Sequence, residues 1–521
     1  MKKISNLCIK LVVLVFLVCC QNNESKTNKT LRLNFEVEPI SLDPKLGTNV
    51  TSQIAIRALF EGLMKIGETG EVVLGIAESY SVSDDKKNYV FKLKDTYWSN
   101  KEKLSAYDFE KAWKNAIRPG SLCRIPQLFY PIKNAKKIRE NILPIDEMGV
   151  RAIDDKTLQV ELEHPVPFFL SLLSNPLFSP TKNIDVEDKI NEIISNGPFI
   201  LGDYQPNKGM YLVKNPHYHL SDQIKIDKID ISFIKDNQTA MYMFNKGEFD
   251  FIGDPVSKIP FEEEEKLLKA DKLNIMPVAG MYWIGFNTEK TPYDNIHFRR
   301  ALAYSLNNEL FSQELNNKKP AKTFVPDFMS NLKEFSSWFD VNEAQKQLEI
   351  ALSELNLSKD SLPVIKLTYC EKMDGGGKRL PLLIKSQWEN NLKIKVDLQE
   401  VEWNSYLDAI FKHKLDVAGV PWFSYINDSL YLLETFKLRS YLSNWTLWEN
   451  KEFAESLDKS NQCAELEERK KFLSNAEKVI EKEMPIVPLF YEDYRYLIKP
   501  NVQNIVFSKI GELEFRYCSI N

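Results

Sequence analysis

The 521-residue chain lacks the short motifs that mark the commonest catalytic and nucleotide-binding sites. It contains no G-x-S-x-G, no H-E-x-x-H, no G-x-x-x-x-G-K-S/T and no G-x-G-x-x-G sequence. The closest approach to a phosphate-binding loop is GGGKR at 375–379, which lacks the first glycine and the hydroxyl residue after the lysine. These absences argue against an enzyme.

Histidine is scarce, with five residues in the whole chain. His217 and His219 alternate in NPHYH, a spacing that would place two imidazoles on one face of a strand, where they could bind a metal. No third ligand lies nearby in the sequence, so we expect a surface strand, no metal site and no cofactor. A haem or nickel-complex binder is the alternative that these two histidines would support.

Cysteine is also sparse and widely spaced. Of the seven cysteines, four lie in the body of the chain, at Cys123, Cys370, Cys463 and Cys518. They form no C-x-x-C pair, which argues against a zinc site and a dithiol redox motif. The spacing leaves open whether any of the four form disulfides in an oxidising compartment.

The chain has no excess of positive charge, because 68 lysines and arginines stand against 73 aspartates and glutamates. Without a basic stripe we expect no nucleic-acid partner. Hydrophobic residues make up 43% of the chain, which is ordinary for a globular protein, and the length allows roughly three lobes. Aromatic residues are plentiful, and besides filling the core they would suit an aromatic-lined cleft.

The apolar run near the amino terminus is too short to span a bilayer, which takes about 20 residues. This run, Leu11–Val18, follows three lysines and precedes Cys20, the order found in bacterial lipoprotein signals. We therefore predict a lipoprotein signal peptide over residues 1–19, a lipid-modified Cys20 and a polar tether over residues 20–30. An ordinary signal peptide with incidental cysteines is the alternative.

Hydrophobic periodicity alternates between strand and helix along the body. Residues 30–35 alternate as a strand, and residues 105–120 form a helix. Ser105 caps this helix, and Asp108 stands three residues later, as in a capping box. Residues 365–401 have the order strand, helix, strand, which predicts a βαβ unit with parallel strands.

Several short segments match one family in their order and spacing. They are SLDP with LFEGL, AESYSVSDDKKNYVFKLK, AYDFEKAWKNAIRP, GVRAIDDKTLQVELEHPVPFF, NGPF…VKNPHY, FNKGEFDF, FRRALAYSLN and IVPLFY. In these segments the chain resembles the oligopeptide-type extracytoplasmic solute-binding proteins of bacterial ABC importers, solute-binding protein family 5. The resemblance implies a two-lobed α/β fold of the periplasmic-binding-protein type II, with a hinge and an extra subdomain on the first lobe.

The resemblance also implies domain boundaries. Lobe I would combine residues 31–50, 175–279 and 485–521, the extra subdomain would be 51–174, and lobe II would be 280–484. The implied protein is a monomer, lipid-anchored to the cell membrane on its periplasmic side, that delivers short peptides to an ABC permease and its ATPase subunits. A secreted peptide hydrolase is the alternative from another functional class.

In this family the ligand is bound as an extra strand between the lobes. Two segments flank it, and here they correspond to Glu38–Ser41 and Val420–Tyr425. The implied ligand-binding residues are Glu38, Pro39, Ile40, Ser41, Tyr282, Trp283, Trp403, Val420, Trp422, Phe423, Ser424, Tyr425 and Asp428. Core packing is the alternative role for the tryptophans.

One expected side chain is missing from this set. In the oligopeptide branch an aspartate three residues after the cleft tryptophan pairs with the α-amine of the ligand. That position is Tyr425 here, and an arginine that often precedes the strand is replaced by Gly419. A buried ammonium without a carboxylate is costly.

Three explanations for the missing acid are open. Asp428 or Glu38 supplies the charge, or the amine lies in a wetter part of the cleft. Otherwise the ligand lacks a standard free amine, as a modified or cell-wall stem peptide would, or is a nickel- or haem-type solute. We expect a peptide of about two to five residues whose end is recognised differently.

Overall fold

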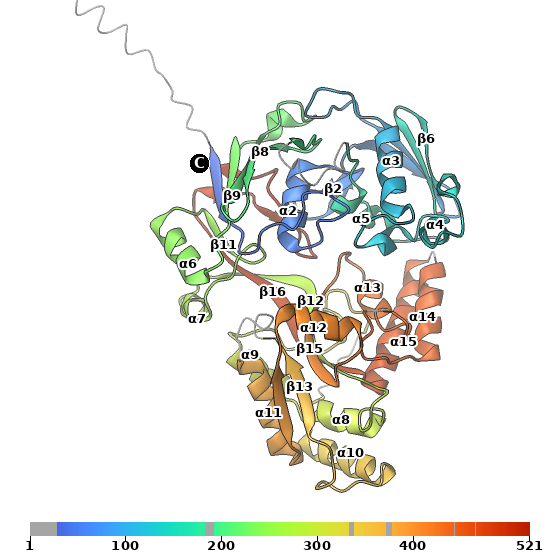
Figure 1. Cartoon of the computed structure of the whole chain (residues 1–521), viewed down its shortest axis with the longest axis vertical. Coiled ribbons are helices and arrows are strands. Elements are labelled where there is room, and N and C mark those ends of the chain that lie inside the picture. Colours follow the sequence, from blue (N-terminus) through green and yellow to red (C-terminus); the bar gives the residue numbers. More distant parts are fainter. Residues whose placement is uncertain (1–28, 183–191, 333–337, 371–377, 442, 464) are drawn as a thin grey trace, which may run out of the picture.

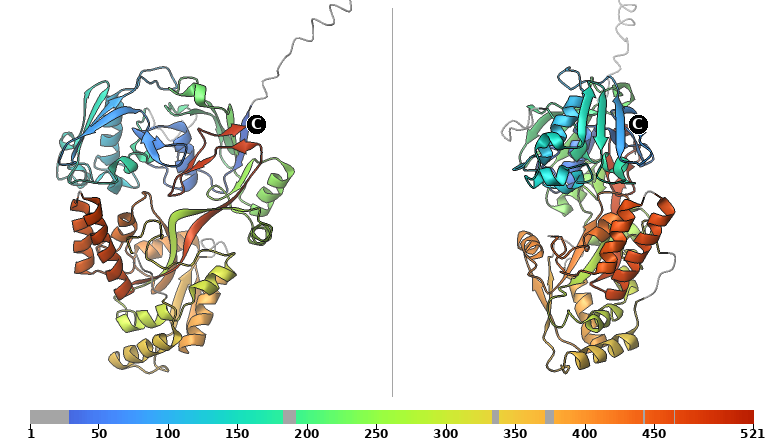
Figure 2. Two further views of the ribbon diagram at one scale, coloured as in Figure 1. Left: turned by 180° about the vertical axis from the view of Figure 1, so that it is seen from behind. Right: turned by 90° about the vertical axis from the view of Figure 1, so that its right-hand side faces the viewer.

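The computed structural model describes residues 29–182, 192–332, 338–370, 378–441, 443–463 and 465–521. The predicted signal peptide over 1–19, Cys20, most of the tether over 20–30 and the three glycines of 375–379 lie outside the described residues. The described chain is a mixture of helices and sheets, as its periodicity predicts. Two bodies, one above the other, are joined by long strands (Figures 1 and 2).

The first sheet has four strands, in the order β1 (Thr30–Asn34), β10 (Lys228–Ser232), β9 (Gly209–Lys214) and β8 (Phe199–Gln205). β1 runs parallel to β10, although about 200 residues of sequence separate them. Leu31, Leu33 and Phe35 are all fully buried, which confirms the alternation predicted for this strand. The first residues of the described chain are therefore held in a sheet.

A second four-stranded sheet is antiparallel, in the order β4 (Ala77–Val82), β5 (Asn88–Leu93), β7 (Thr157–Glu161) and β6 (Val150–Asp154). Helix α3 (Ala106–Ile117) packs against it through Phe109 and Trp113, which are both 0% exposed. The backbone N–H of Ser105 donates to the Asp108 carboxylate at 2.8 Å, so the predicted capping box is present.

The third sheet has six strands and forms the centre of the other body. Its order is β11 (Phe251–Gly253), β16 (Ile486–Ile498), β12 (Asn274–Phe286), β15 (Val417–Phe423), β13 (Ile365–Tyr369) and β14 (Val396–Glu400). β13 and β14 are parallel and are connected by helix α11 (Arg379–Leu392). The predicted βαβ unit is therefore confirmed.

The remaining elements surround these sheets. Helices are α2 (Val50–Leu59), α4 (Ala135–Arg139), α5 (Phe169–Leu172), α6 (Asn237–Lys246), α7 (Phe261–Lys269), α8 (Ile296–Tyr304), α9 (Asn308–Glu314), α10 (Val341–Glu354), α12 (Trp403–Phe411), α13 (Ser429–Glu434), α14 (Lys451–Gln462) and α15 (Leu466–Glu483). Short strands are β2 (Met64–Ile66), β3 (Val72–Leu74), β17 (Val502–Gln503), β18 (Val506–Phe507), β19 (Leu513–Glu514) and β20 (Ser519–Ile520), and 3₁₀ turns are η1 (Pro126–Phe129), η2 (Ile145–Glu147), η3 (Pro176–Phe178) and η5 (Ser221–Gln223).

The described chain buries two large hydrophobic cores. The first is built from side chains between residues 31 and 256, together with Ile426 and side chains between 502 and 518. The second is built from side chains between residues 279 and 491. We call the bodies around them lobe I and lobe II. The 13-residue strands β12 and β16 pair with each other and run from one body to the other (Figure 1).

The histidine pair differs from its prediction. His217 and His219 lie in a turn after β9 rather than on a strand. The His219 side chain is 8% exposed, and its Nε2 lies 2.8 Å from Oε1 of Glu61, which is fully buried. Glu61 also forms an ion pair with Arg516. His219 is thus part of a buried charge network of lobe I, which the strand-like alternation of NPHYH does not reveal.

A candidate ligand-binding cavity between the lobes

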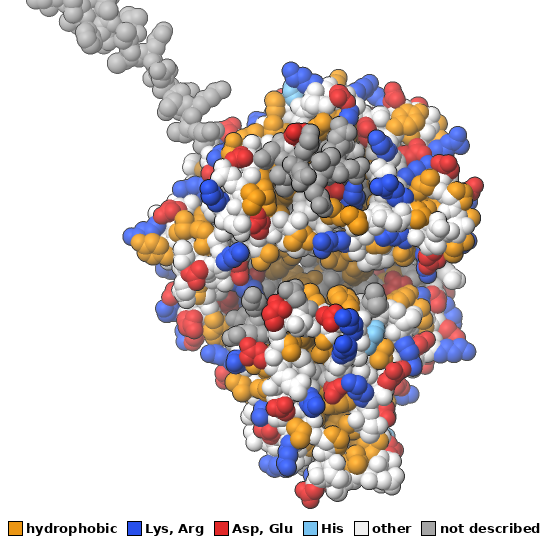
Figure 3. Space-filling view, viewed as in Figure 1, with side chains coloured by type: hydrophobic (Ala, Val, Ile, Leu, Met, Phe, Trp, Pro, Cys, Tyr) orange, Lys and Arg blue, Asp and Glu red, His pale blue; other side chains and the backbone are white. Residues whose placement is uncertain are grey.

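A cavity of about 1300 Å³ lies between lobe I and lobe II. The surface of the molecule is hollowed at this level, between its upper and lower halves (Figure 3). The volume exceeds the roughly 300–1,000 Å³ of sites for drug-sized molecules, so it has room for an extended ligand. Its walls include Arg57 and Phe168 from lobe I and Trp422 and Tyr425 from lobe II.

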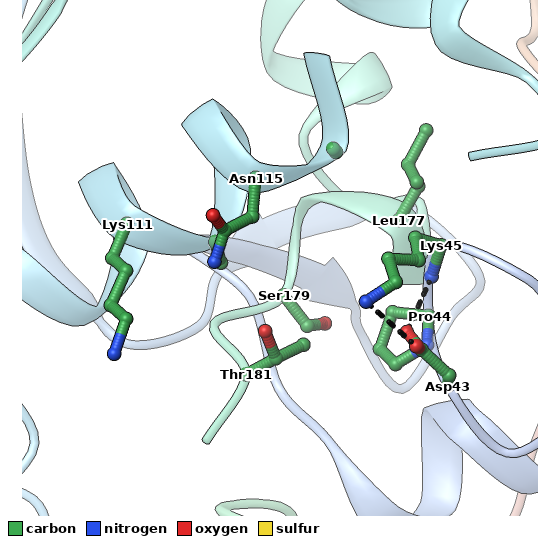
Figure 4. A pocket seen from close by; sticks show the side chains of 10 residues that line it. Asp43, Pro44, Lys45, Lys111, Asn115, Leu177, Ser179 and Thr181 are labelled. Atoms are coloured by element: carbon green, nitrogen blue, oxygen red, sulfur yellow. Dashed lines mark hydrogen bonds and ion pairs between the residues drawn. The ribbon is translucent and has the colours of Figure 1, made fainter. Parts of the chain in front are cut away.

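A separate pocket of about 60 Å³ lies in lobe I beside α3 (Figure 4). Lys111 and Asn115 of α3 face the chain at Ser179 and Thr181, and Lys45 forms an ion pair with Asp43 at 3.2 Å. This volume holds only a few water molecules. We therefore assign ligand binding to the cavity between the lobes.

Strand β15 brings a free edge to the cavity. It pairs with β12 along its whole length, but with β13 only at Val417 and Ala418. Within the described chain, no strand pairs with the other edge of β15 from Gly419 to Phe423. Pro421, Trp422 and Phe423 line the cavity, so an extended ligand could add to this edge as a further strand.

Gly419 is required by the close approach of Tyr282. A Cβ atom at position 419 would lie 2.1 Å from the Tyr282 hydroxyl oxygen. The backbone carbonyl of Gly419 also accepts a hydrogen bond from the Tyr406 hydroxyl at 2.5 Å. Any side chain at this position, including the arginine that the resemblance leads one to look for, would collide with Tyr282.

The structure brings five of the predicted ligand-binding residues to the cavity wall. They are Tyr282, Trp422, Phe423, Ser424 and Tyr425. Phe423 is 42% exposed, and burial raises the pKa of the Tyr425 phenol. These residues come from β12, from β15 and from the turn that follows β15, as the resemblance leads us to expect.

Three other predicted residues of lobe II lie away from the cavity wall. Trp283 is 2% exposed and stacks on Trp445 in the second core, with ring centroids 6.2 Å apart. Val420 is 4% exposed and packs in the second core, and Trp403 begins α12 without lining the cavity. Side chains alternate across a strand, so neighbours in sequence need not share a wall.

Neither predicted substitute for the missing acid is available. The Asp428 carboxylate caps α13 and accepts two hydrogen bonds from Arg469, at 2.8 and 2.9 Å. The Glu38 carboxylate accepts from the Tyr204 hydroxyl at 2.5 Å and from the Asn207 backbone N–H at 3.2 Å. Glu38, Pro39, Ile40 and Ser41 are also absent from the cavity wall.

The hinge end of the cavity carries a dense set of charges that the sequence did not suggest. Lys318 lies between Glu492 and Asp493, at 3.2 and 2.8 Å, and these acids raise the pKa of its ammonium although burial acts to lower it. Arg495 pairs with Glu264 at 2.6 Å. Burial raises the pKa of nearby Asp254 to about 6. The pairing of β11 with β16 brings Asp254 beside Arg495, and the pairing of Pro320 with Phe490 brings Lys318 to the same place.

The family model for bacterial extracellular solute-binding proteins, family 5 Middle, matches residues 71–443. The chain belongs to this family.

Other members of family 5 match over nearly the whole chain. The oligopeptide-binding protein OppA of Bacillus subtilis is 34% identical over 508 residues, which cover 95% of this chain and 93% of OppA. The dipeptide-binding protein DppE of the same organism is 30% identical, with 96% and 94% covered. The structure of the murein tripeptide binding protein MppA of Escherichia coli has a TM-score of 0.82 at 26% identity, covering 95% of this chain and 99% of that one.

These matches confirm the predicted family and its two-lobed α/β fold. The relatives that we name are binding proteins, not enzymes. Within the described residues, we find no helix that is both long and apolar enough to cross a membrane. No group of three or more histidine, cysteine or acidic side chains in the described chain could hold a metal ion.

Proposed function

We propose that this chain is the substrate-binding subunit of an ABC peptide importer, tethered outside the cytoplasmic membrane by a lipid on Cys20. It captures short peptides as a β-strand between its two lobes and hands them to the permease, and it acts as a monomer. The observation that carries this proposal is the edge of β15 from Gly419 to Phe423, with which no described strand pairs, beside a cavity of about 1300 Å³.

The edge of β15 suits a ligand of variable sequence. Backbone groups of the strand can bond to the backbone of any peptide, except at Pro421, which has no N–H to donate, and at Gly419, whose carbonyl already accepts from Tyr406. Trp422 and Phe423 give apolar surface on either side. The large volume leaves room for varied side chains and for water between them and the wall. Selectivity would therefore depend mainly on the backbone and the charged ends of the ligand.

The two lobes supply the motion that capture and release need. The paired strands β12 and β16 join them, and small rotations in such connections open or close a cleft. Arg469 of lobe II lies over the Phe168 ring of lobe I, 5.9 Å from its centroid, so the lobes already touch across the cavity. Binding involves no bond-breaking step in this scheme.

Calorimetric titration with alanine peptides of about two to five residues tests the proposal. We expect micromolar or tighter binding, together with a smaller radius of gyration in small-angle X-ray scattering when the peptide is added. Mass spectrometry of small molecules that co-purify would identify the natural ligand. If only haem, a nickel complex or a sugar co-purifies, and no peptide binds, the peptide proposal is wrong.

A modified peptide, such as a cell-wall stem peptide, is a second candidate ligand on the same fold. It is favoured by Tyr425 at the position of the expected acid and by the similarity to MppA, a murein tripeptide binding protein. Titration with a stem tripeptide that lacks the muramyl sugar, and separately with trialanine, distinguishes this candidate from an ordinary peptide. Tighter binding of the stem peptide by more than about tenfold would favour this candidate.

A further inference from the structure

The cavity has a second charged region, away from the hinge end, at the end of α13. Glu434 is the last residue of α13 and lines the cavity together with Tyr425, Tyr431 and Tyr441. His164 of lobe I faces the same region. α13 lies beside α14, on the opposite side of the molecule from β11 and α7 (Figures 1 and 2).

Most carboxylates that line the cavity already form an ion pair with a cation of the protein. Glu264 pairs with Arg495, Glu492 and Asp493 pair with Lys318, and Glu512 pairs with Arg57. Among the described residues, this leaves Asp254 without an ion pair and Glu434 with a weak one. These two carboxylates are the candidates for binding a cationic group of the ligand.

The negative charge of Glu434 is only weakly balanced by nearby cations of the protein. Its closest cation is Lys437 at 3.9 Å, but the ammonium of Lys437 lies 2.5 Å from Asp458, which holds it. Glu434 also stands in the last turn of a helix, where the backbone carbonyls disfavour a negative charge. Burial raises the pKa of its carboxyl, and Lys437 opposes this only in part. Another positive charge here would therefore stabilise the ionised carboxylate.

The surroundings of Glu434 suit an ammonium better than those of Asp254. Asp254 lies near Lys258 and Lys318, which repel a further cation, and it accepts a hydrogen bond from the Arg495 backbone. The Glu434 side chain is 39% exposed where it opens to the cavity.

Tyrosine rings line the part of the cavity next to Glu434. Tyr425 and Tyr431 meet edge to face with centroids 5.7 Å apart, and burial together with the nearby Glu434 raises the pKa values of Tyr431 and Tyr441. Neutral tyrosine rings attract cations through their faces, so they add to the pull of a carboxylate.

We propose that Glu434, with the rings of Tyr425, Tyr431 and Tyr441, forms a subsite for an alkylammonium group of the ligand. The inference rests on the proposed peptide-binding function and specifies how the peptide is oriented. It also explains how Tyr425 can replace an acid, because the carboxylate comes from the end of the next helix. The ammonium belongs either to the peptide amino terminus or to a lysine side chain.

Calorimetry with three probes tests the subsite. The probes are trialanine, N-acetyl-trialanine and N-acetyl-Ala-Ala-Lys. For the wild type we expect trialanine to bind at least about tenfold more tightly than N-acetyl-trialanine. Glu434→Gln should reduce this ratio to near one, whereas Asp254→Asn, the matched change at the hinge end, should preserve it. If N-acetyl-Ala-Ala-Lys binds like trialanine and loses affinity in Glu434→Gln, the subsite takes the lysine ammonium.

The opposite outcomes overturn the inference. If the ratio survives Glu434→Gln, or is lost in Asp254→Asn instead, the ammonium does not bind at Glu434. Lys437→Met is a second variant, which removes the cation that competes with the ligand for Glu434. It should increase the preference for the free amine. An unchanged or smaller preference contradicts the subsite. If the wild type binds none of the three probes, the proposed function itself fails, and the subsite fails with it.

Discussion

Asp254, which lines the cavity, lowers the stability of the folded protein at neutral pH. Burial raises the pKa of its carboxyl from the usual 3.8 to about 6, although Lys318, Lys258 and the Arg495 backbone N–H favour the charged form and Glu264 opposes it. Tyr494 packs close by and is also buried. A carboxyl that is harder to ionise in the folded state than in the unfolded state stabilises the fold only while it is protonated.

Asp254→Asn should therefore stabilise the protein at pH 7.5 and not at pH 4. The folded state keeps its proton up to about pH 6 and the unfolded state only to about pH 4, so the wild type loses stability as the pH rises between these values. A shift of this size corresponds to about 2–3 kcal/mol at pH 7.5. Urea unfolding of both proteins at the two pH values measures the difference. Equal stability at pH 7.5 would show that Asp254 ionises normally.

Trp422→Ala should weaken peptide binding about tenfold or more without unfolding the protein. Trp422 lines the cavity on the free edge of β15, and its removal takes away apolar contact surface. Trp403→Ala is the comparison, because Trp403 is 36% exposed and lies outside the cavity wall. Calorimetry with trialanine and circular dichroism of both variants give the result. Equal losses of affinity in the two variants would contradict the placement of Trp422 on the cavity wall and of Trp403 outside it.

At the scale of the element, the sequence pattern correctly predicts those features that depend on residues close together in the chain. The capping box of α3, the alternation of β1 and the βαβ unit of β13, α11 and β14 all depend on neighbours within a few dozen residues. The β15 segment is likewise one continuous run, so the family resemblance is enough to predict its place at the cavity. Period and capping signals are strongest in such continuous segments.

The other wall of the cavity could not be predicted in this way. Asp254, Lys318 and Glu492 come from three distant parts of the chain, and the pairing of β11 with β16 and of Pro320 with Phe490 places them together. Glu434 belongs to no motif, and the family-matching segment that contains His164 does not indicate that this side chain reaches the cavity. The burial of Trp283 was also hidden, since strand alternation alone does not tell which face of β12 meets the core.

One buried ion pair helps to position helix α13. Asp428 and Arg469 are 12% and 4% exposed, and the Asp428 carboxylate also accepts the Leu430 backbone N–H at 3.0 Å. This pair ties the start of α13 to α15, and Glu434 stands at the other end of α13.

Asp428→Ala should lower the free energy of unfolding by about 3–5 kcal/mol, because it leaves a buried guanidinium unpaired and removes a helix cap. Asp408→Ala is the matched control. Asp408 pairs with Lys412 at 2.6 Å, but both are more than half exposed, so we expect a loss of under about 1 kcal/mol. Urea unfolding measures both. Similar losses would mean that the pair does not hold α13.

At the scale of the whole molecule, the proposed membrane attachment rests on the amino-terminal sequence alone. Cys20 directly follows the apolar run and Cys19, and polar residues follow it. Cys20→Ser should move the protein from the membrane fraction to the soluble extracytoplasmic fraction. Cys19→Ser should leave it at the membrane, because only the cysteine at the cleavage point receives the lipid. Detergent-free fractionation and immunoblotting give the answer; a membrane-bound Cys20→Ser protein would contradict the anchor.

The return of the chain to lobe I has a consequence for the order in which the protein can fold. β1 and the strands between Val502 and Ile520 belong to the same body, and Arg516 forms a buried ion pair with Glu61, which precedes it by 455 positions. The second core uses one continuous stretch, residues 279–491. During export that begins at the amino terminus, lobe II can therefore finish folding while lobe I waits for the final 20 or so residues to emerge. Until then, the unfinished lobe exposes apolar surface that a chaperone could shield.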